Sequence, residues 1–245
     1  MKVIILAAGR GSRLKKYTKY QPKAFNLFKN ERYIDLIIKN FKENRLNNIN
    51  IVTGYKNYLF KKIKYKKIYN SSWRKSNIFY SLYKTNKLLK KNICIISYSD
   101  IVFKKEAIRL LKEKKGDIVV LNNCNWKKTW KRRFKKPLND LEKFNYIKKN
   151  DEKYLTEIGG TPKNLNSIRG QFAGLFKITP RGWRHILNLI KKDKIDIKKI
   201  DMTTFFSFFL KKKKLIIKIV DYKGMWFEID TVKDFKILNS TKKNL

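Results

Sequence analysis

The sequence predicts an α/β fold, a three-layer α/β/α sandwich in which helices cover both faces of a mainly parallel sheet. Two observations carry this prediction. Short apolar runs alternate with segments of helical period along most of the chain, a pattern typical of parallel strands joined by crossover helices. The first apolar run, residues 3–6, leads directly into a turn with two glycines, as expected where a strand meets a ligand-binding loop.

Each expected element follows from its own pattern of apolar and polar residues. Continuous apolar runs bounded by turn residues predict the strands. These are expected at residues 3–6, 50–53, 67–69, 93–97, 117–122, 174–178, 215–220 and 225–229. Apolar residues that recur at helical spacing predict the helices. These are expected at residues 33–44, 77–89, 105–114, 181–191, 202–210 and 231–239.

The chain is expected to form a single domain over residues 1–240. Residues 125–170 are polar and aromatic with no clear period, so we expect an irregular insertion that lies over the sheet and the active site. Residues 241–245 form a Lys-rich end that is expected to be frayed. No apolar stretch approaches the roughly 20 residues of a membrane span, so none is expected.

The chain is strongly basic, with 61 Lys and Arg against 19 Asp and Glu and a net charge of +42. A basic nucleic-acid-binding module is therefore one hypothesis. However, the lysines are scattered and outnumber arginines, whereas specific phosphate recognition favours Arg, so we expect no specific nucleic-acid partner. The two cysteines, Cys94 and Cys124, do not form a disulfide framework and indicate a reducing, cytoplasmic location.

The glycine turn after the first expected strand reads LAAGRGSRL over residues 6–14. Glycines allow the backbone to approach a phosphate closely, and two arginines nearby suit a highly anionic ligand. The turn is neither a dinucleotide fingerprint, since its third glycine position holds Leu14, nor a P-loop, since no Gly-Lys-Ser/Thr closes it. Taken alone, it is also compatible with a tight strand–helix turn that carries surface arginines.

A second motif follows the turn closely. Pro22 restricts the backbone before Lys23, so the lysine has a defined direction and could neutralise a second phosphate. Together the two motifs resemble the LAAGxGxRL turn and PK motif of nucleotidyltransferases that activate sugar phosphates and small phosphorylated alcohols. The segments TGYK (53–56), YNSSWRKSNIFYSLY (69–83), SYSDIVF (97–103) and WFEIDTVKDF (226–235) are similar to the branch that contains CTP:phosphocholine cytidylyltransferases.

This resemblance implies a Rossmann-like nucleotidyltransferase fold of the glycosyltransferase-A type and a reaction between CTP and a small phospho- or phosphono-acceptor. The acceptor phosphate is largely ionised near neutral pH, so no strong general base is required, and the single histidine, His185, is expected to be structural. Arg13 and Lys23 are the expected catalytic cations. The residues expected to bind the nucleotide are Leu6, Ala7, Ala8, Gly9, Gly11, Asn77 and Ser81. Helix capping is the alternative role for Asn77.

Three carboxylates are candidates for binding Mg²⁺. Asp100 follows an expected strand, and Glu228 and Asp230 lie two residues apart in an extended segment, so their side chains share a side. Mg²⁺ is typically held by one or two carboxylates together with phosphate oxygens. The resemblance implies an Asp after the central strand and an acidic pair near the carboxyl end, which these residues match. The alternative is that they pair with lysines.

The acceptor site is less defined in the sequence. Trp126, Trp130 and Trp226, with Phe172, could form an aromatic cage for a quaternary ammonium, with Asp140 or Glu142 as counter-charge. These aromatic residues could equally belong to the core. A second set favours an acceptor with hydroxyl or acidic groups instead, namely Arg132, Arg133, Arg169 and Gln171.

The resemblance therefore implies an enzyme, a Mg²⁺-dependent cytidylyltransferase that acts on a phosphocholine-like or 2-aminoethylphosphonate-like acceptor. A sugar-1-phosphate uridylyl- or thymidylyltransferase is the alternative reaction, although the chain is short for one. A homodimer is possible. The sequence leaves the acceptor open.

Overall fold

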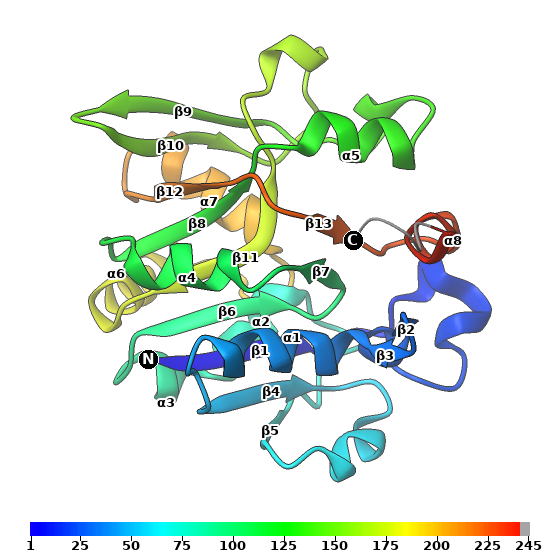
Figure 1. Ribbon diagram of the computed structural model, residues 1–245. Coiled ribbons are helices and arrows are strands. Elements are labelled where there is room, and N and C mark those ends of the chain that lie inside the picture. Colours follow the sequence, from blue (N-terminus) through cyan, green and yellow to red (C-terminus); the bar gives the residue numbers. More distant parts are fainter. Residues whose placement is uncertain (241–245) are drawn as a thin grey trace.

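The computed structural model describes residues 1–240, and the end expected to be frayed, 241–245, lies outside the described residues. Its main feature is a nine-stranded sheet in the order β5-β4-β1-β6-β11-β8-β12-β10-β9 (Figure 1). The strands of this sheet are β1 (Lys2–Ala7), β4 (Ile49–Thr53), β5 (Lys66–Tyr69), β6 (Cys94–Tyr98), β8 (Ile118–Asn123), β9 (Phe144–Lys149), β10 (Glu152–Ile158), β11 (Phe172–Ile178) and β12 (Lys218–Tyr222). The α/β fold expected from the alternating pattern is confirmed.

The sheet has two halves with different strand directions. In the first half, β1 pairs in parallel with β4 and β6, and β4 pairs in parallel with β5. In the second half, β11 runs antiparallel to both of its neighbours, β6 and β8, and the β9–β10 hairpin joins antiparallel to β12. Only β8 and β12 are parallel there. The sheet is therefore mixed, with its parallel strands concentrated in the N-terminal half.

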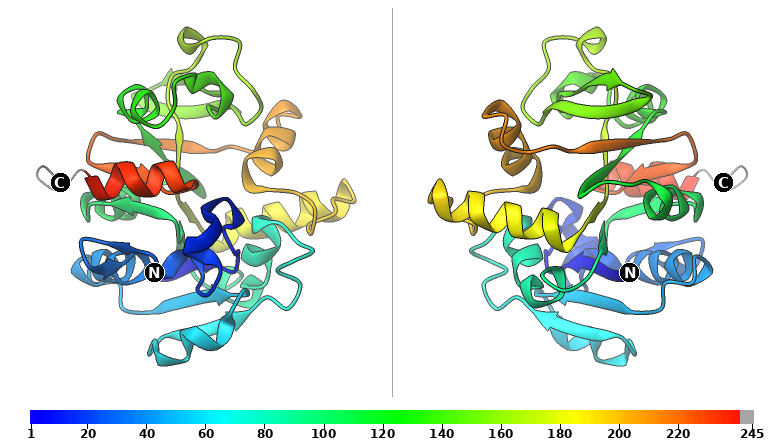
Figure 2. Two further views of the ribbon diagram at one scale, coloured as in Figure 1. Left: turned by 90° about the vertical axis from the view of Figure 1, so that its right-hand side faces the viewer. Right: turned by 90° about the vertical axis from the view of Figure 1, so that its left-hand side faces the viewer.

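Helices cover both faces of the sheet (Figure 2). One face carries α1 (Tyr33–Glu43) and α4 (Glu106–Glu113), and the other carries α2 (Ile78–Tyr83), α6 (Pro180–Lys192) and α7 (Met202–Lys211). In α1, the buried residues Ile34, Ile37, Ile38 and Phe41 lie at the spacing that places them on one side of a helix. That side faces the sheet. The expected helix 77–89 is instead two short helices, α2 and α3 (Asn86–Leu89), which are separated at Thr85.

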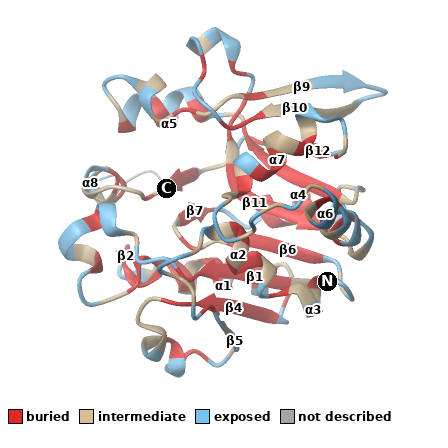
Figure 3. Ribbon diagram, turned by 180° about the vertical axis from the view of Figure 1, so that it is seen from behind, coloured by how far each residue is buried: buried red, intermediate tan, exposed pale blue. Residues whose placement is uncertain are grey.

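The core lies along the sheet, where most strand residues are buried (Figure 3). The central strand β1 is a continuous apolar run because helices cover both of its faces. Its register aligns Leu6 with Tyr98 of β6, and Ala7 with Thr53 of β4. The segments that follow these three strands therefore emerge side by side at one edge of the sheet, as expected for parallel strands.

Smaller elements gather at this carboxyl edge. A two-stranded sheet pairs β7 (Ile101–Phe103) with β13 (Trp226–Glu228), and a short hairpin pairs β2 (Leu27–Phe28) with β3 (Glu31–Arg32). Helix α8 (Val232–Ser240) follows β13 and packs near the segment that follows β1. The pairing of β13 with β7 brings the C-terminal acidic pair next to the turn after β6.

The expectation of an irregular insertion at 125–170 is wrong. This segment contains α5 (Trp126–Arg133) and the β9–β10 hairpin, which extends the sheet at its edge (Figure 1). The hairpin turns at Asn150 and Asp151, whose φ angles are 47° and 58°. Two left-handed residues make the type of turn that Asn and Asp favour between paired strands. The sequence signal was therefore present, but β9 ends in two consecutive lysines, Lys148 and Lys149, which interrupt the alternation of apolar and polar residues. Within residues 1–240, no helix has the length and apolarity that crossing a bilayer requires.

Candidate active site

The turn after β1 forms one wall of a cavity of about 350 Å³ at the carboxyl edge of the sheet. Gly11 has a φ of 72°, and a Cβ atom there would lie 2.7 Å from the Lys23 side chain, so only glycine fits without a shift. Gly9 has no atom near its missing Cβ, so its backbone is open to a ligand. The residues that line this cavity are Leu6, Ala8, Gly9, Gly11, Arg13, Lys23, Trp73, Ser76, Asn77, Ile78, Ser81, Ser99, Asp100 and Asp230.

The structure brings six of the seven residues expected to bind a nucleotide to this first cavity, and the seventh, Ala7, is buried behind it. Asn77 is exposed and caps α2, because its Oδ1 accepts a hydrogen bond from the backbone N–H of Ile78 at 2.7 Å. Ser81 lies one turn further along and is buried. Its hydroxyl accepts a hydrogen bond from Asn70 Nδ2 at 3.1 Å. Both side chains thus have structural partners and also line the cavity.

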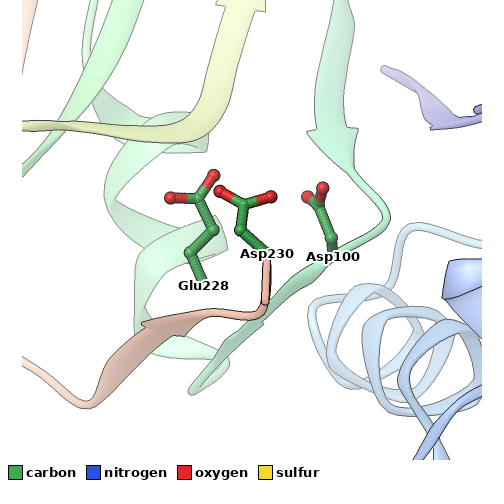
Figure 4. Close-up of side chains that lie close together, drawn as sticks. All are labelled: Asp100, Glu228 and Asp230. Carbon is green, nitrogen blue, oxygen red and sulfur yellow. The ribbon is translucent and has the colours of Figure 1, made fainter. Parts of the chain in front are cut away.

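The three expected metal ligands come together beside this cavity. One carboxylate oxygen from each of Asp100, Glu228 and Asp230 lies within 4.8 Å of the others, and the side chains project to the same side (Figure 4). The backbone supports this arrangement, since the Ile229 N–H donates to the Asp100 carbonyl at 2.9 Å. Asp100 Oδ1 is buried and has no hydrogen-bond partner in the described part of the chain, which is costly unless a cation binds there. A hard cation such as Mg²⁺ therefore fits this donor set.

Two expected catalytic cations contact the same carboxylates. Lys23 is 7% exposed, and its Nζ lies 2.7 Å from Asp100 Oδ2 and 2.6 Å from Asp230 Oδ1. Burial opposes its charged form, but the two carboxylates hold the pKa of Lys23 above its ordinary value. Arg13 Nη2 lies 3.0 Å from Asp230 Oδ1, and its side chain is largely exposed. The alternative that these acids pair with a lysine thus describes part of the arrangement, but it leaves Asp100 Oδ1 without a partner.

The surroundings shift the pKa values of Glu228 and Asp230 in opposite directions. Burial, then the charge of Asp230, raise the pKa of Glu228 well above its usual range. Burial also opposes the charge of Asp230, but Lys23 lowers the pKa of Asp230 below its ordinary value.

Arg133 lies on the Glu228 side of this pair. It is fully buried, so the expectation that Arg133 faces an acidic acceptor is wrong, because carboxylates of the protein already surround it.

A second cavity, of about 360 Å³, adjoins the first. Arg13, Ile78 and Asp230 line both cavities. The other residues that line the second cavity are Tyr98, Trp130, Asp140, Glu142, Gln171, Phe172, Gly174, Asp201, Met202, Thr203 and Glu228. The second cavity is thus acidic although the chain as a whole is strongly basic.

The residues expected to bind the acceptor divide into two groups. Trp130 lines the second cavity and stacks on Trp226, with ring centroids 5.6 Å apart and an interplanar angle of 7°. Trp226 is buried behind it and donates from Nε1 to the Ala173 carbonyl. Gln171 also lines the cavity, and its side-chain amide bonds the backbone of a neighbouring loop. The structure does not bring two others to the cavity wall: Trp126, which belongs to the core, and Arg169, which donates to the Tyr146 carbonyl.

Two carboxylates of the second cavity lack a cation. Within the described part of the chain, no Lys, Arg or His nitrogen lies within 4.0 Å of Glu142 or Asp201. The hydroxyl of Thr203 lies between them, 3.2 Å from Glu142 Oε1 and 3.1 Å from Asp201 Oδ1. Burial raises the pKa of Glu142 above its usual value. Sequence reasoning missed Asp201 and Thr203. The available signal was Asp201 itself, since Asp is a common N-cap and its side chain accepts a hydrogen bond from the Thr204 N–H at the start of α7.

Comparison with known proteins assigns the chain to a family. Residues 3–141 match the family model described as a MobA-like NTP transferase domain. The chain belongs to this family. The chain is also 32% identical to the CTP:phosphoglutamine cytidylyltransferase of Campylobacter jejuni, over 97% of this chain and 98% of that protein. The chain is therefore a nucleotidyltransferase, as its two N-terminal motifs predict.

Further relatives agree with this assignment. Over 108 residues the chain is 36% identical to the choline-phosphate cytidylyltransferase of Streptococcus pneumoniae, covering 42% of this chain and 47% of that protein. A solved CTP:phosphocholine cytidylyltransferase from S. pneumoniae superimposes with a TM-score of 0.72 at 21% identity, over 99% of each chain. An inositol-1-phosphate CTP transferase from T. maritima gives 0.69 at 19% identity, over 100% of this chain and 97% of that one. At these identities the two structures show the shared fold.

Proposed function

We propose that this nucleotidyltransferase is a Mg²⁺-dependent cytidylyltransferase. It would transfer CMP from CTP to a small phosphorylated or phosphonylated acceptor and release pyrophosphate. The observation that carries the proposal is the junction of two cavities at one carboxylate cluster. The first cavity has a glycine turn and basic residues, the second is acidic, and Arg13 and Asp230 line both. The relatives named as cytidylyltransferases support CTP as the donor.

The chemistry requires charge neutralisation more than a base. An oxygen of the acceptor phosphate attacks the α-phosphorus of CTP, a new P–O bond forms, and the bond to the β-phosphate breaks to release pyrophosphate. Because the acceptor oxygen is already ionised near neutral pH, no side chain needs to remove its proton. In this proposal the backbone N–H groups of Gly9 and Gly11 bind the triphosphate, and Arg13 and Lys23 offset the charge that accumulates.

A divalent cation completes the charge balance. Asp100, Glu228 and Asp230 would hold Mg²⁺, and the orphaned Asp100 Oδ1 supports this role. When bound, Mg²⁺ supplies positive charge to the phosphate oxygens. Lys23 lies against two of the same carboxylates and lines the first cavity. Its ammonium is therefore placed to offset the charge of the triphosphate there.

The second cavity suits an acceptor with a positively charged nitrogen. Glu142 and Asp201 face this cavity with no cation partner among residues 1–240, and an ammonium group would satisfy both. Trp130, Tyr98 and Phe172 contribute ring surface to the same cavity, which favours a cation over an anion. The acceptors in the relatives' names also include a charged nitrogen: phosphocholine has a quaternary ammonium, and phosphoglutamine has an α-ammonium group beside an α-carboxylate. An ammonium-bearing acceptor is therefore the substrate class that we propose.

Pyrophosphate release with Mg²⁺ and CTP across matched acceptors tests the proposal. The sharpest pair is 2-aminoethylphosphonate and 2-hydroxyethylphosphonate, which differ only in the amino group. Acceptors with a positively charged nitrogen are called cationic here, and those without one are called neutral. Phosphoethanolamine, phosphocholine and phosphoglutamine extend the cationic set, and glycerol phosphate and inositol phosphate extend the neutral set. We expect turnover with at least one cationic acceptor and more slowly or not at all with its neutral partner.

The other outcomes also decide between hypotheses. Turnover of only the neutral acceptors would contradict the proposed acceptor class and leave cytidylyl transfer intact. Release with UTP or dTTP and glucose 1-phosphate, but not with CTP, would replace the proposal with the sugar-nucleotide alternative. If no combination releases pyrophosphate and the chain binds DNA with a steep salt dependence, the enzymatic proposal is contradicted in favour of nucleic-acid binding.

A further inference from the structure

Arg133, the last residue of α5, is an arginine with no exposed surface. Its guanidinium lies between aromatic rings, 5.0 Å from the centroids of both Trp130 and Phe134. Burying a charge in such surroundings is costly unless it is paired and hydrogen-bonded. Burial thus opposes its charge, but hydrogen bonds to Asp234 and the charge of Glu228 hold the pKa of Arg133 above its ordinary value.

The guanidinium is oriented by Asp234, which is also fully buried. Arg133 Nε donates to Asp234 Oδ1 at 2.9 Å, and Nη2 donates to Oδ2 at 3.3 Å. The same Oδ2 accepts hydrogen bonds from the backbone N–H groups of Asp230 at 3.1 Å and Thr231 at 2.9 Å. Asp234 therefore fixes both the direction of the arginine fork and the backbone that carries Asp230.

The two terminal nitrogens of the fork, Nη1 and Nη2, also face the carboxylate cluster. Nη1 lies 3.4 Å from Glu228 Oε2, and Nη2 lies 3.8 Å from Asp230 Oδ2. Lys23 contacts the opposite side of the cluster, through Asp230 Oδ1. Asp230 thus has a cation on each of its oxygens. Three carboxylates with oxygens within 4.8 Å repel one another, and a fixed positive charge on the Glu228 side reduces that repulsion.

Arg133 lines neither of the two cavities, so it acts through other residues rather than on a substrate. We propose that Arg133, oriented by Asp234, is a positioning residue that holds Glu228 and Asp230 in the arrangement required to bind a divalent cation. This inference rests on the proposed function, because it concerns the same carboxylate cluster. A lysine would keep the charge but lose the planar fork that reaches Asp234 and Glu228 together.

Binding of Mn²⁺ alone, measured by electron paramagnetic resonance without substrates, tests this role independently of activity. Arg133→Lys keeps the charge, and Asp234→Asn keeps the shape but weakens the anchor. We expect both variants to bind Mn²⁺ about 10–100-fold more weakly than the unaltered chain, the usual cost of losing a partner that orients a metal ligand. Lys131→Arg, an exposed change in the same helix, is the matched control and should bind normally.

Activity provides a second readout. Turnover of Arg133→Lys should require a correspondingly higher Mg²⁺ concentration, while circular dichroism shows an intact fold. If Mn²⁺ binding in both variants equals or exceeds that of the unaltered chain, and Asp100→Asn still abolishes it, the positioning role is overturned and the proposed function stands. If the unaltered chain binds Mn²⁺ no better than Asp100→Asn does, the proposed metal site and the role of Arg133 are both overturned.

Discussion

The two halves of the sheet border cavities of different charge. The half built from parallel strands β5, β4, β1 and β6, the proposed nucleotide half, ends in a glycine turn, and in its cavity Arg13 and Lys23 balance Asp100 and Asp230. The half that contains antiparallel β11 and the β9–β10 hairpin, the proposed acceptor half, borders a cavity with five carboxylates. These are Asp140, Glu142, Asp201, Glu228 and Asp230.

The contrast shows that the net charge of the chain does not predict the charge of an individual cavity. The chain has 61 basic and only 19 acidic residues, yet five of the acidic residues surround one cavity. Most other acids have a lysine or arginine within 4.0 Å, whereas Glu142 and Asp201 do not among the described residues. Such placement is selective in a chain where lysines are abundant, and it favours a cationic ligand in this half only.

Asp100→Asn is expected to have the largest effect, because Asp100 lies where the two halves meet. The substitution removes the carboxylate charge that faces Lys23 and the proposed Mg²⁺ site while keeping the side-chain shape. Pyrophosphate release should fall by more than about 100-fold, since even partners behind a metal ligand are worth about 10–100-fold. Full activity in this variant would contradict the metal assignment. Asp151→Asn, in the exposed hairpin turn, is the control.

The sequence predicted which residues meet around the first cavity, because their signals are local, and their role in binding a nucleotide stays a prediction. The glycine turn, the PK motif and the apolar run of β1 each occupy a few consecutive residues, and parallel pairing then brings their ends together. Asp100, Glu228 and Asp230 were also predicted, since two of them share one extended segment. What local spacing could not show is that Lys23 lies against these carboxylates, from 77 residues before Asp100 and 207 before Asp230.

The acceptor half was predicted less well because tertiary packing decides it. Trp126, Trp130 and Trp226 look alike in sequence, but only Trp130 lines the second cavity, and Trp226 is stacked behind it. Arg133 sits in a run of basic residues that suggested an anionic acceptor, yet its helix turns it inward. A residue's type does not indicate which side of a helix will be buried when the helix itself was not predicted.

Glu142→Gln is expected to affect only the acceptor half. The substitution removes a charge next to the proposed ammonium and can keep the hydrogen bond from Thr203. A hydrogen bond to a charged group is worth about 1.5–3 kcal/mol, so the KM of a cationic acceptor should rise about tenfold or more. The KM of CTP should stay unchanged, which steady-state kinetics with each substrate varied in turn would measure.

Two comparisons check the origin of that effect. Glu113→Gln, an exposed change in α4, should leave both KM values unchanged. With a neutral acceptor, Glu142→Gln should have no effect on KM, because no ammonium is present to lose its partner. An equal increase in the KM of CTP would mean that Glu142 supports the whole site rather than the acceptor half, and the comparison between the halves would then fail.

The pH dependence of acceptor binding is the smallest expected effect. Burial, and then the charges of Asp201 and Asp140, raise the pKa of Glu142, so this carboxyl gains its proton at a higher pH than an exposed Glu does. Protonation removes the attraction to an ammonium group, so the KM of a cationic acceptor should rise as the pH falls. The increase is about twofold at the pH where half of the Glu142 carboxyls are protonated. The acceptor phosphate also titrates, near pH ~6, but it does so equally in Glu142→Gln. The ratio of the two KM profiles therefore isolates Glu142, and a ratio that does not change with pH would show that this carboxylate does not contact the ammonium.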